Sequence, residues 1–194
     1  MAEYRIEPLS AATWPAFQAL VEKHNGIFGG CWCMYFHPDD DHVGDNPSAK
    51  RRLVEQNRAH HALVMEGDVA VGWCEYGTPA ELPRIYHRKE YDSSGIEPTT
   101  FRLPCFFVDR NHRRRGVATL ALSGALELIS VAGGGSVEGY PRVDVGQKKM
   151  SSSFLFSGSI GMFENAGFTR GPNLGKFRCI MRRTVAPAGN LPLH

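Results

Sequence analysis

Apolar and polar residues recur along the N-terminal part of the chain at spacings that indicate its secondary structure. Alternation predicts a short strand over residues 4–10. Apolar residues at helical spacing predict a helix over 11–25, with Pro15 in its first turn. Residues 26–48 are rich first in glycine, then in aromatic and finally in acidic residues, and are expected to form a loop. A second helix is expected over 49–60.

Two apolar runs in the middle of the chain predict a β-hairpin. The runs cover residues 61–67 and 69–77, and only Asp68 separates them, directly after Gly67. The segment that follows, 78–99, carries mixed signals and yields no firm prediction.

The C-terminal half alternates between strand and helix patterns. This order predicts one mixed α/β domain over residues 1–184 and a flexible tail over 185–194. The expected elements are a strand (100–109), a helix (116–132) that ends at three glycines, a short strand (136–141), a polar loop (142–153), a short helix (159–168) and a closing strand (176–184).

Composition and charge narrow the functional classes. Of the 194 residues, 42% are hydrophobic and 22% are charged, which is typical of a soluble globular domain. The net charge of +2 argues against a general polyanion binder, so any basic site must be local. The sequence contains no membrane-length apolar run and no signal-peptide core. The five cysteines are an odd number and do not suggest a disulfide framework, so we expect a cytoplasmic protein with reduced thiols.

The most informative stretch reads VDRNHRRRGVAT, residues 108–119, and places three arginines before a helix. Cations at a helix N-terminus are unfavourable by about 0.3–1 kcal/mol each unless an anion binds there. Gly116 would let an anion approach the backbone, because glycine has no Cβ. Arg113, Arg114 and Arg115 would add charge-assisted hydrogen bonds to phosphate oxygens. The stretch therefore predicts a phosphate site, and the simpler alternative is that the arginines only solvate the helix start.

The spacing of this turn resembles a family signature. Arg113-x-x-Gly116-x-Ala118 is similar to the Arg/Gln-x-x-Gly-x-Gly/Ala signature of the GNAT superfamily of N-acetyltransferases, and it follows the expected strand that ends in Val108. In that superfamily a helix near the C-terminus often ends in a Gly-Phe pair, as MFENAGF (162–168) does here.

The resemblance covers roughly residues 4–184 by element order and about 100–168 by motif. It implies a GNAT-like mixed central sheet that is mostly antiparallel and flanked by helices. It also implies that this sheet is splayed between the strands at 100–109 and 136–141.

The resemblance further implies that the protein uses acetyl-CoA as a co-substrate, needs no metal, and acetylates a primary amine by direct attack in a ternary complex. The strand would offer backbone groups to the pantetheine arm, and the turn would hold the pyrophosphate. Thr119 could donate its hydroxyl there or be an ordinary first-turn residue. The implied cofactor-binding residues are Phe106, Phe107, Val108, Arg113, Arg114, Arg115, Gly116, Val117, Ala118, Thr119 and Phe163.

Two glutamates are candidates for the general base. A lysine-like amine has a pKa of about 10.4, so a base or a water chain must take its proton. Glu75 and Glu138 each lie at the end of an apolar strand, where burial of their neighbours would raise a carboxyl pKa toward neutrality. The simpler alternative for each is an outward-facing residue in water.

The proton donor for the leaving thiolate marks a departure from the family pattern. Many members place a tyrosine where this chain has Phe163, which cannot donate a proton. Tyr140 is a candidate substitute, although packing is the more common role for such a residue. A third alternative is no acid at all, because a thiol pKa of about 8.5 makes the thiolate a tolerable leaving group.

The stretch CWCMYFH, residues 31–37, is expected to contribute to the acceptor pocket. Trp32, Met34 and Tyr35 would supply apolar walls, and Trp73 on the hairpin is a further candidate. The alternative is a core lid without ligand contact.

Two other features of this region have simpler interpretations. Cys31, Cys33 and His37 lack the spacing of a structural zinc site, so no metal is expected. The acidic run at 39–41 would attract a cationic acceptor, although such runs are more often solvated.

Three classes of function follow. The first is an N-acetyltransferase for a small-molecule or peptide amine. The second is a GNAT-fold module that binds acyl-CoA with little catalysis, which is consistent with Phe163. The third is a basic protein that contacts nucleic acid, which the low net charge and the lack of aromatic residues around the arginines disfavour. We expect no membrane partner, and a homodimer is compatible with such a fold.

Overall fold

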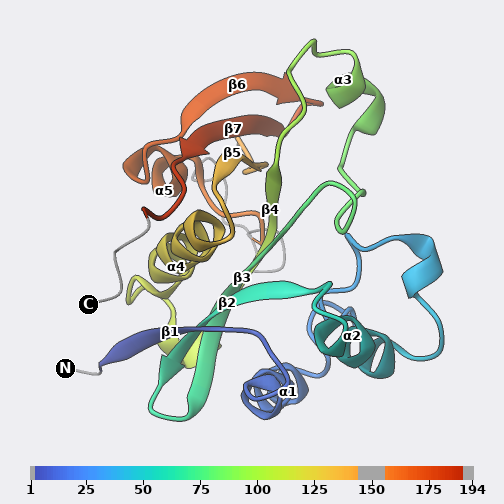
Figure 1. The fold of residues 1–194 in the computed structure, drawn as a ribbon, viewed down its shortest axis with the longest axis vertical. Coiled ribbons are helices and arrows are strands. Elements are labelled where there is room, and N and C mark those ends of the chain that lie inside the picture. Colours follow the sequence, from blue (N-terminus) through green and yellow to red (C-terminus); the bar gives the residue numbers. More distant parts are fainter. Residues whose placement is uncertain (1–2, 144–155, 190–194) are drawn as a thin grey trace.

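The computed structural model describes residues 3–143 and 156–189, which form one seven-stranded sheet with helices on both faces (Figure 1). The strand order is β1-β2-β3-β4-β5-β7-β6, and only the β4–β5 pair is parallel. The expected mixed, mostly antiparallel sheet is confirmed. The strands are β1 (Tyr4–Pro8), β2 (His60–Glu66), β3 (Val69–Gly77), β4 (Phe101–Val108), β5 (Gly135–Gly139), β6 (Thr169–Leu174) and β7 (Arg178–Val185).

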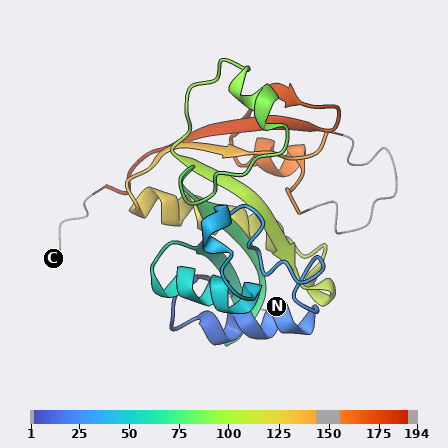
Figure 2. The same ribbon diagram turned by 90° about the vertical axis from the view of Figure 1, so that its right-hand side faces the viewer.

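Helices cover the two faces of the sheet in pairs. α1 and α2 lie on one face, and α4 and α5 lie on the other (Figure 2). The helices are α1 (Trp14–Lys23), α2 (Asn46–Glu55), α3 (Arg88–Asp92), α4 (Val117–Val131) and α5 (Ile160–Asn165), with short 3-10 turns at Asp39–Asp41 and Arg110–His112.

Strand alternation decides which residues reach each face. From Cys105 onward, Cys105 and Phe107 pack with the core under α1 and α2, whereas Phe106 between them packs with the core under α4 and α5. Leu103 also packs under α4 and α5, because the register of the β3–β4 pair shifts between Glu75 and Gly77 and interrupts the alternation there. This two-residue period gives the two sides of β4 different chemistry.

One expected helix starts earlier than predicted, and one strand was not predicted. α2 begins at Asn46, earlier than residue 49, because the side chain of Asp45 accepts the Ser48 N–H and caps the helix. β6 was missed entirely, because five of its six residues are exposed and the strand reads TRGPNL, with no apolar alternation.

The sheet splays between β4 and β5, as the resemblance implied. The two strands pair in parallel only from Phe101↔Val137 to Leu103↔Gly139. Pro104 follows and has no N–H to donate, while β4 continues to Val108 beyond the last β5 partner. The far end of β4 is therefore open on the β5 side.

The end of the described chain lies against α4. The Ser130 hydroxyl donates to the carbonyl of Ala186, and the Ala188 N–H donates to the carbonyl of Ser130. Of the expected tail, 190–194 lie outside the described residues, as does most of the expected polar loop at 142–153. Among the helices of the described ranges, none is long and apolar enough to cross a membrane.

Candidate functional site

A cleft of about 820 Å³ lies where β4 ends and α4 begins, and we call it the basic cleft. Its floor is the open end of β4, and its far wall is the first turn of α4. The predicted cofactor residues that line it are Phe106, Phe107, Val108, Arg113, Arg114, Gly116, Val117, Ala118 and Thr119.

Gly116 begins α4 and leaves the backbone accessible to an anion. Its φ of +79° is the left-handed conformation that glycine adopts readily, and a Cβ at this position would meet no atom within 4 Å. The first intrahelical bond runs from the Leu120 N–H to the carbonyl of Gly116. The amides of residues 117–119 therefore lack intrahelical acceptors and add to the positive end of the helix dipole.

The three arginines leave a positive charge at this turn. Arg113, Arg114 and Arg115 are exposed, and within the described ranges none of them forms an ion pair. Burial lowers the pKa of His24, which also lines the cleft, and the charge of Arg113 acts in the same direction. Of the three arginines, Arg113 and Arg114 line the cleft and Arg115 does not.

The open edge of β4 offers backbone groups to the cleft. The Phe106 N–H points away from β3 and donates to the carbonyl of Phe156 at 2.6 Å. Because side-chain and amide directions repeat every two residues, the Val108 N–H points the same way. One of the backbone donors expected to face the pantetheine arm is thus satisfied within the chain.

Phe163 does not line the cleft, in contrast to its predicted cofactor contact. It is fully buried, and its ring meets the rings of Phe106 and Phe168 edge-on at centroid distances of 6.0 and 5.0 Å. A Cβ at Gly139 would lie 2.3 Å from this ring, so the phenylalanine fills the space over β5. Its role in this structure is packing.

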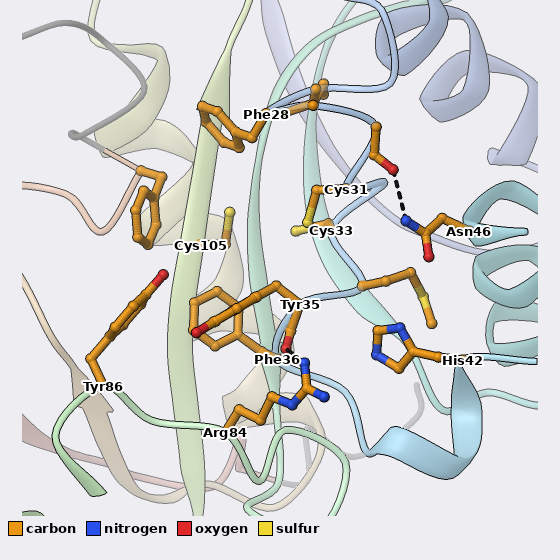
Figure 3. A pocket seen from close by; sticks show the side chains of 15 residues that line it. Phe28, Cys31, Cys33, Tyr35, Phe36, His42, Asn46, Arg84, Tyr86 and Cys105 are labelled. Atoms are coloured by element: carbon orange, nitrogen blue, oxygen red, sulfur yellow. Dashed lines mark hydrogen bonds between the residues drawn. The ribbon is translucent and has the colours of Figure 1, made fainter.

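A second cavity, of about 560 Å³, adjoins the basic cleft, and we call it the aromatic pocket (Figure 3). Ile27, Phe28 and Phe156 line both cavities. The pocket lies on the α1/α2 side of β4, where Cys105 faces it. A group bound in the cleft and a group bound in the pocket would meet beside the middle of β4.

Two of the four predicted acceptor residues line the aromatic pocket. Met34 and Tyr35 do, whereas Trp32 and Trp73 do not. Trp32 stacks on Trp14 at a ring distance of 6.2 Å, and Trp73 is fully buried and stacks on Phe107 at 4.9 Å. Both tryptophans belong to the core under α1; for Trp32, this agrees with the alternative that the loop has a core role without ligand contact.

The other lining residues were missed by the sequence reasoning, and Tyr86, Cys105 and His42 are among them. Burial, then the neighbouring Tyr35, raises the pKa of Tyr86 to about 12. Figure 3 shows its hydroxyl directed toward Cys105 on β4. The two-residue period of β4 could have placed Cys105, but Tyr86 lies in a segment without a periodic signal.

Glu75 is buried in a charged cluster. The Lys50 ammonium donates to Glu75 Oε1 at 3.0 Å, to His37 Nε2 at 3.0 Å and to the carbonyl of Cys33 at 3.1 Å, and both charged side chains are fully buried. Burial alone would raise the pKa of Glu75, but the charge of Lys50 and the nearby His37 ring, 3.5 Å from Oε1, outweigh it and lower that pKa. The expected upward shift is wrong, and a carboxylate so well stabilised is a poor proton acceptor.

The same cluster brings metal-ligand types together. Ligand atoms of Cys33, His61 and Glu75 lie within 4.8 Å of one another. Lys50 already supplies the positive charge there, and burial raises the pKa of the Cys33 thiol well above its usual value. We therefore interpret the cluster as a buried ion pair that anchors residues 33–37 to β3.

Glu138 and Tyr140 lie together, away from both cavities. The hydroxyls of Tyr91 and Tyr140 both donate to Glu138 Oε2 at 2.9 Å, and Arg182 lies 3.7 Å from Oε1. Burial, then the charge of Glu138, raises the pKa of Tyr140 well above its usual value. Neither residue lines the basic cleft or the aromatic pocket.

The acidic run at 39–41 is largely neutralised. Asp39 pairs with Arg84, and the carboxylate of Asp41 accepts two hydrogen bonds from Arg58, each of 2.9 Å. These pairs leave little negative charge to attract a cationic acceptor.

Comparison with known proteins gives a structural likeness without a sequence match. No family model matches the chain, and no curated protein does. An N-acetyltransferase from Staphylococcus aureus Mu50 has a TM-score of 0.56 and 13% identity, over 94% of this chain and 99% of that chain. The ribosomal-protein-S18-alanine N-acetyltransferase from Escherichia coli has a TM-score of 0.52 and 11% identity, over 99% and 100%. A protein from Desulfovibrio desulfuricans assigned to the GNAT family of acetyltransferases has a TM-score of 0.51 and 16% identity, over 95% and 99%.

These likenesses establish the class of fold. The chain has the GNAT fold over nearly its whole length, in agreement with the resemblance carried by the arginine turn. At such low identity the likeness concerns the fold alone, and function must be argued from the site.

Proposed function

We propose that the protein is an N-acetyltransferase that moves the acetyl group of acetyl-CoA to a primary amine by direct attack in a ternary complex. The observation that carries the proposal is the pair of adjoining cavities, one basic and one aromatic, that meet at the open edge of β4. The structural neighbours that are N-acetyltransferases support the same class of reaction.

The basic cleft fits the co-substrate. The amides at the start of α4 and the guanidinium groups of Arg113 and Arg114 would hold the pyrophosphate, with Gly116 allowing close approach. The open edge of β4 near Val108 would hold the pantetheine arm. Acetyl-CoA would supply the activated thioester, and the chain's own groups position it and manage the protons.

Tyr86 is our candidate for the general acid. It lines the aromatic pocket, its hydroxyl is directed toward Cys105, and its raised pKa keeps it protonated across the neutral range. A protonated phenol at this position would donate to the departing thiolate sulfur. Tyr86 would thus replace the tyrosine that this chain lacks at Phe163.

The Tyr86→Phe variant is expected to lower kcat by about 10²-fold or more, within the range of lost general-acid catalysis. The KM for acetyl-CoA should stay within a small factor of the parent's, because Tyr86 does not line the basic cleft. The matched control is Tyr140→Phe, whose hydroxyl is held by Glu138 and should leave kcat nearly unchanged. Steady-state kinetics that show the reverse pattern would assign the acid to Tyr140 instead.

A catalytically weak acyl-CoA-binding module is the second candidate. It is favoured by one observation, the hydrogen bond that already occupies the Phe106 N–H. Release of CoA thiol from acetyl-CoA, measured with and without a panel of primary amines, separates the two. Amine-dependent release with formation of the N-acetyl product supports the enzyme, whereas tight binding of acetyl-CoA without amine-dependent release supports the module.

A further inference from the structure

The aromatic pocket is walled by rings. Phe28, Tyr35, Phe36, Tyr86 and Phe156 line it. Tyr35 stacks on Tyr86 at a centroid distance of 5.5 Å and an interplanar angle of 19°, and Phe36 meets Tyr86 at 6.1 Å. Phe28 and Phe36 lie 6.0 and 6.3 Å from Phe156. Contiguous rings of this kind bind a flat or apolar body in preference to a strongly hydrated one.

Negative charge is missing from the wall of this pocket. None of the described residues that line it is an aspartate or a glutamate. Two carboxylates nearby are committed to other partners, since Asp39 pairs with Arg84 and Glu75 pairs with Lys50. A positively charged group of a ligand would find no carboxylate to pair with in this wall.

Two guanidinium groups lie in or beside the wall of the pocket. Arg84, in the wall, donates to the carbonyl of Tyr35 at 3.0 Å. The guanidinium carbon of Arg178 lies 4.4 Å from the Tyr86 ring centroid and 5.1 Å from that of Phe156. These guanidinium groups use aromatic faces that would otherwise attract a ligand ammonium, and they repel additional positive charge.

We propose that the acceptor is a primary amine carried on an uncharged aromatic or aliphatic body, with no second cationic group; this rests on the acetyltransferase function proposed above. The same surroundings explain how the amine becomes a nucleophile. Burial away from a carboxylate disfavours the ammonium form, so the amine gives its ammonium proton to bulk water on entering the pocket and needs neither Glu75 nor Glu138 as a base. As the N–C bond forms and the C–S bond breaks, Tyr86 donates its proton to the thiolate sulfur and the N–H proton released from the nitrogen returns to Tyr86. A second ammonium taken into the pocket would remain buried and unpaired, which is strongly unfavourable.

The test uses two amines of equal length, pentylamine and cadaverine, which differ only in a distal ammonium, with phenethylamine as an aromatic probe. At saturating acetyl-CoA, the parent protein is expected to show a kcat/KM for pentylamine and phenethylamine that is about 100-fold above that for cadaverine, because the distal charge is desolvated without a partner. Cadaverine used equally well or better would overturn the inference.

A pair of variants at Cys31 tests whether the missing carboxylate causes the preference for pentylamine over cadaverine. Cys31 lines the pocket and is partly exposed, so it tolerates a polar side chain better than the buried positions do. Cys31→Asp adds the missing carboxylate and is expected to shift the cadaverine-to-pentylamine ratio by about tenfold toward cadaverine. Cys31→Asn has the same shape without the charge and should leave the ratio unchanged. Equal ratios in the two variants would contradict the electrostatic argument.

The class of acceptor can be tested independently of whether the protein catalyses acetyl transfer. Calorimetric binding of pentylamine and cadaverine to the CoA-saturated protein reports the preference without turnover. A preference for cadaverine in that measurement overturns this inference and leaves the acetyltransferase proposal standing. If pentylamine is preferred but not acetylated, the acetyltransferase proposal fails and the pocket's ligand class is retained.

Discussion

Replacing Lys50 with methionine is expected to lower the free energy of unfolding by about 3–5 kcal/mol, because it leaves the carboxylate of Glu75 buried without its counterion. The substitution also removes the hydrogen bonds that the Lys50 ammonium donates to His37 and to the carbonyl of Cys33. These bonds hold the loop that forms part of the wall of the aromatic pocket. Chemical denaturation of the parent and the variant measures the difference directly.

Two controls separate the lost counterion from other effects of the substitution. Arg51→Met, one position further along the same helix, breaks only the exposed pair with Glu55 and should cost at most about 0.5 kcal/mol. Combining Lys50→Met with Glu75→Gln removes both charges and should recover much of the lost stability. If the double variant is no more stable than Lys50→Met alone, an unpaired carboxylate is not the cause.

The pH dependence provides a further check on the Lys50 variant. In the parent, the lowered pKa of Glu75 contributes stability above the carboxyl group's ordinary pKa, and this contribution is lost as the pH falls toward the lowered value. Without Lys50, burial would instead raise the pKa of Glu75, so protonation on acidification would stabilise the fold. The stability difference between parent and variant is therefore expected to narrow as the pH falls from neutral to acidic values.

Replacing Gly116 with glutamate is expected to weaken acetyl-CoA binding by at least about 100-fold. The new side chain projects into open space at the start of α4 and places a negative charge where the pyrophosphate is proposed to bind. In the parent, acetyl-CoA at 100 times its Kd should stabilise the fold by about 2.7 kcal/mol, which is visible as a rise in Tm. In the variant the same concentration should give almost no rise.

Gly116→Gln is the matched control for this variant. Both substitutions strain the backbone equally, because the φ of +79° disfavours any side chain with a Cβ. They differ in charge alone, so glutamine should weaken binding clearly less than glutamate. Equal thermal shifts in the parent and Gly116→Glu would place the pyrophosphate somewhere else.

The fold could be predicted because its main signals are local. The apolar run of β4, the three arginines and the helix that follows them are continuous in sequence, and they place the basic cleft without any long-range information. β6 was not predicted, because its sequence TRGPNL shows no alternation of apolar and polar residues and has low strand propensity, and the strand is an exposed edge of the sheet.

The acceptor side depends on contacts between distant residues, which a single sequence does not reveal. The burial of Glu75 could be anticipated from its strand, but its partner Lys50 is 25 residues away on helix α2. Trp32 and Tyr35 belong to the same aromatic stretch, yet one packs in the core and the other lines the pocket. Which side a loop residue faces is decided by tertiary packing and not by the pattern of the loop itself.

A calorimetric titration of acetyl-CoA into the parent protein measures directly whether the basic cleft binds the co-substrate. We expect saturable one-site binding in the micromolar range that weakens as salt is added, since Arg113 and Arg114 contribute charge to the site. If acetyl-CoA does not bind at any salt concentration, the cleft is not a CoA site and the arginine turn binds a different anion.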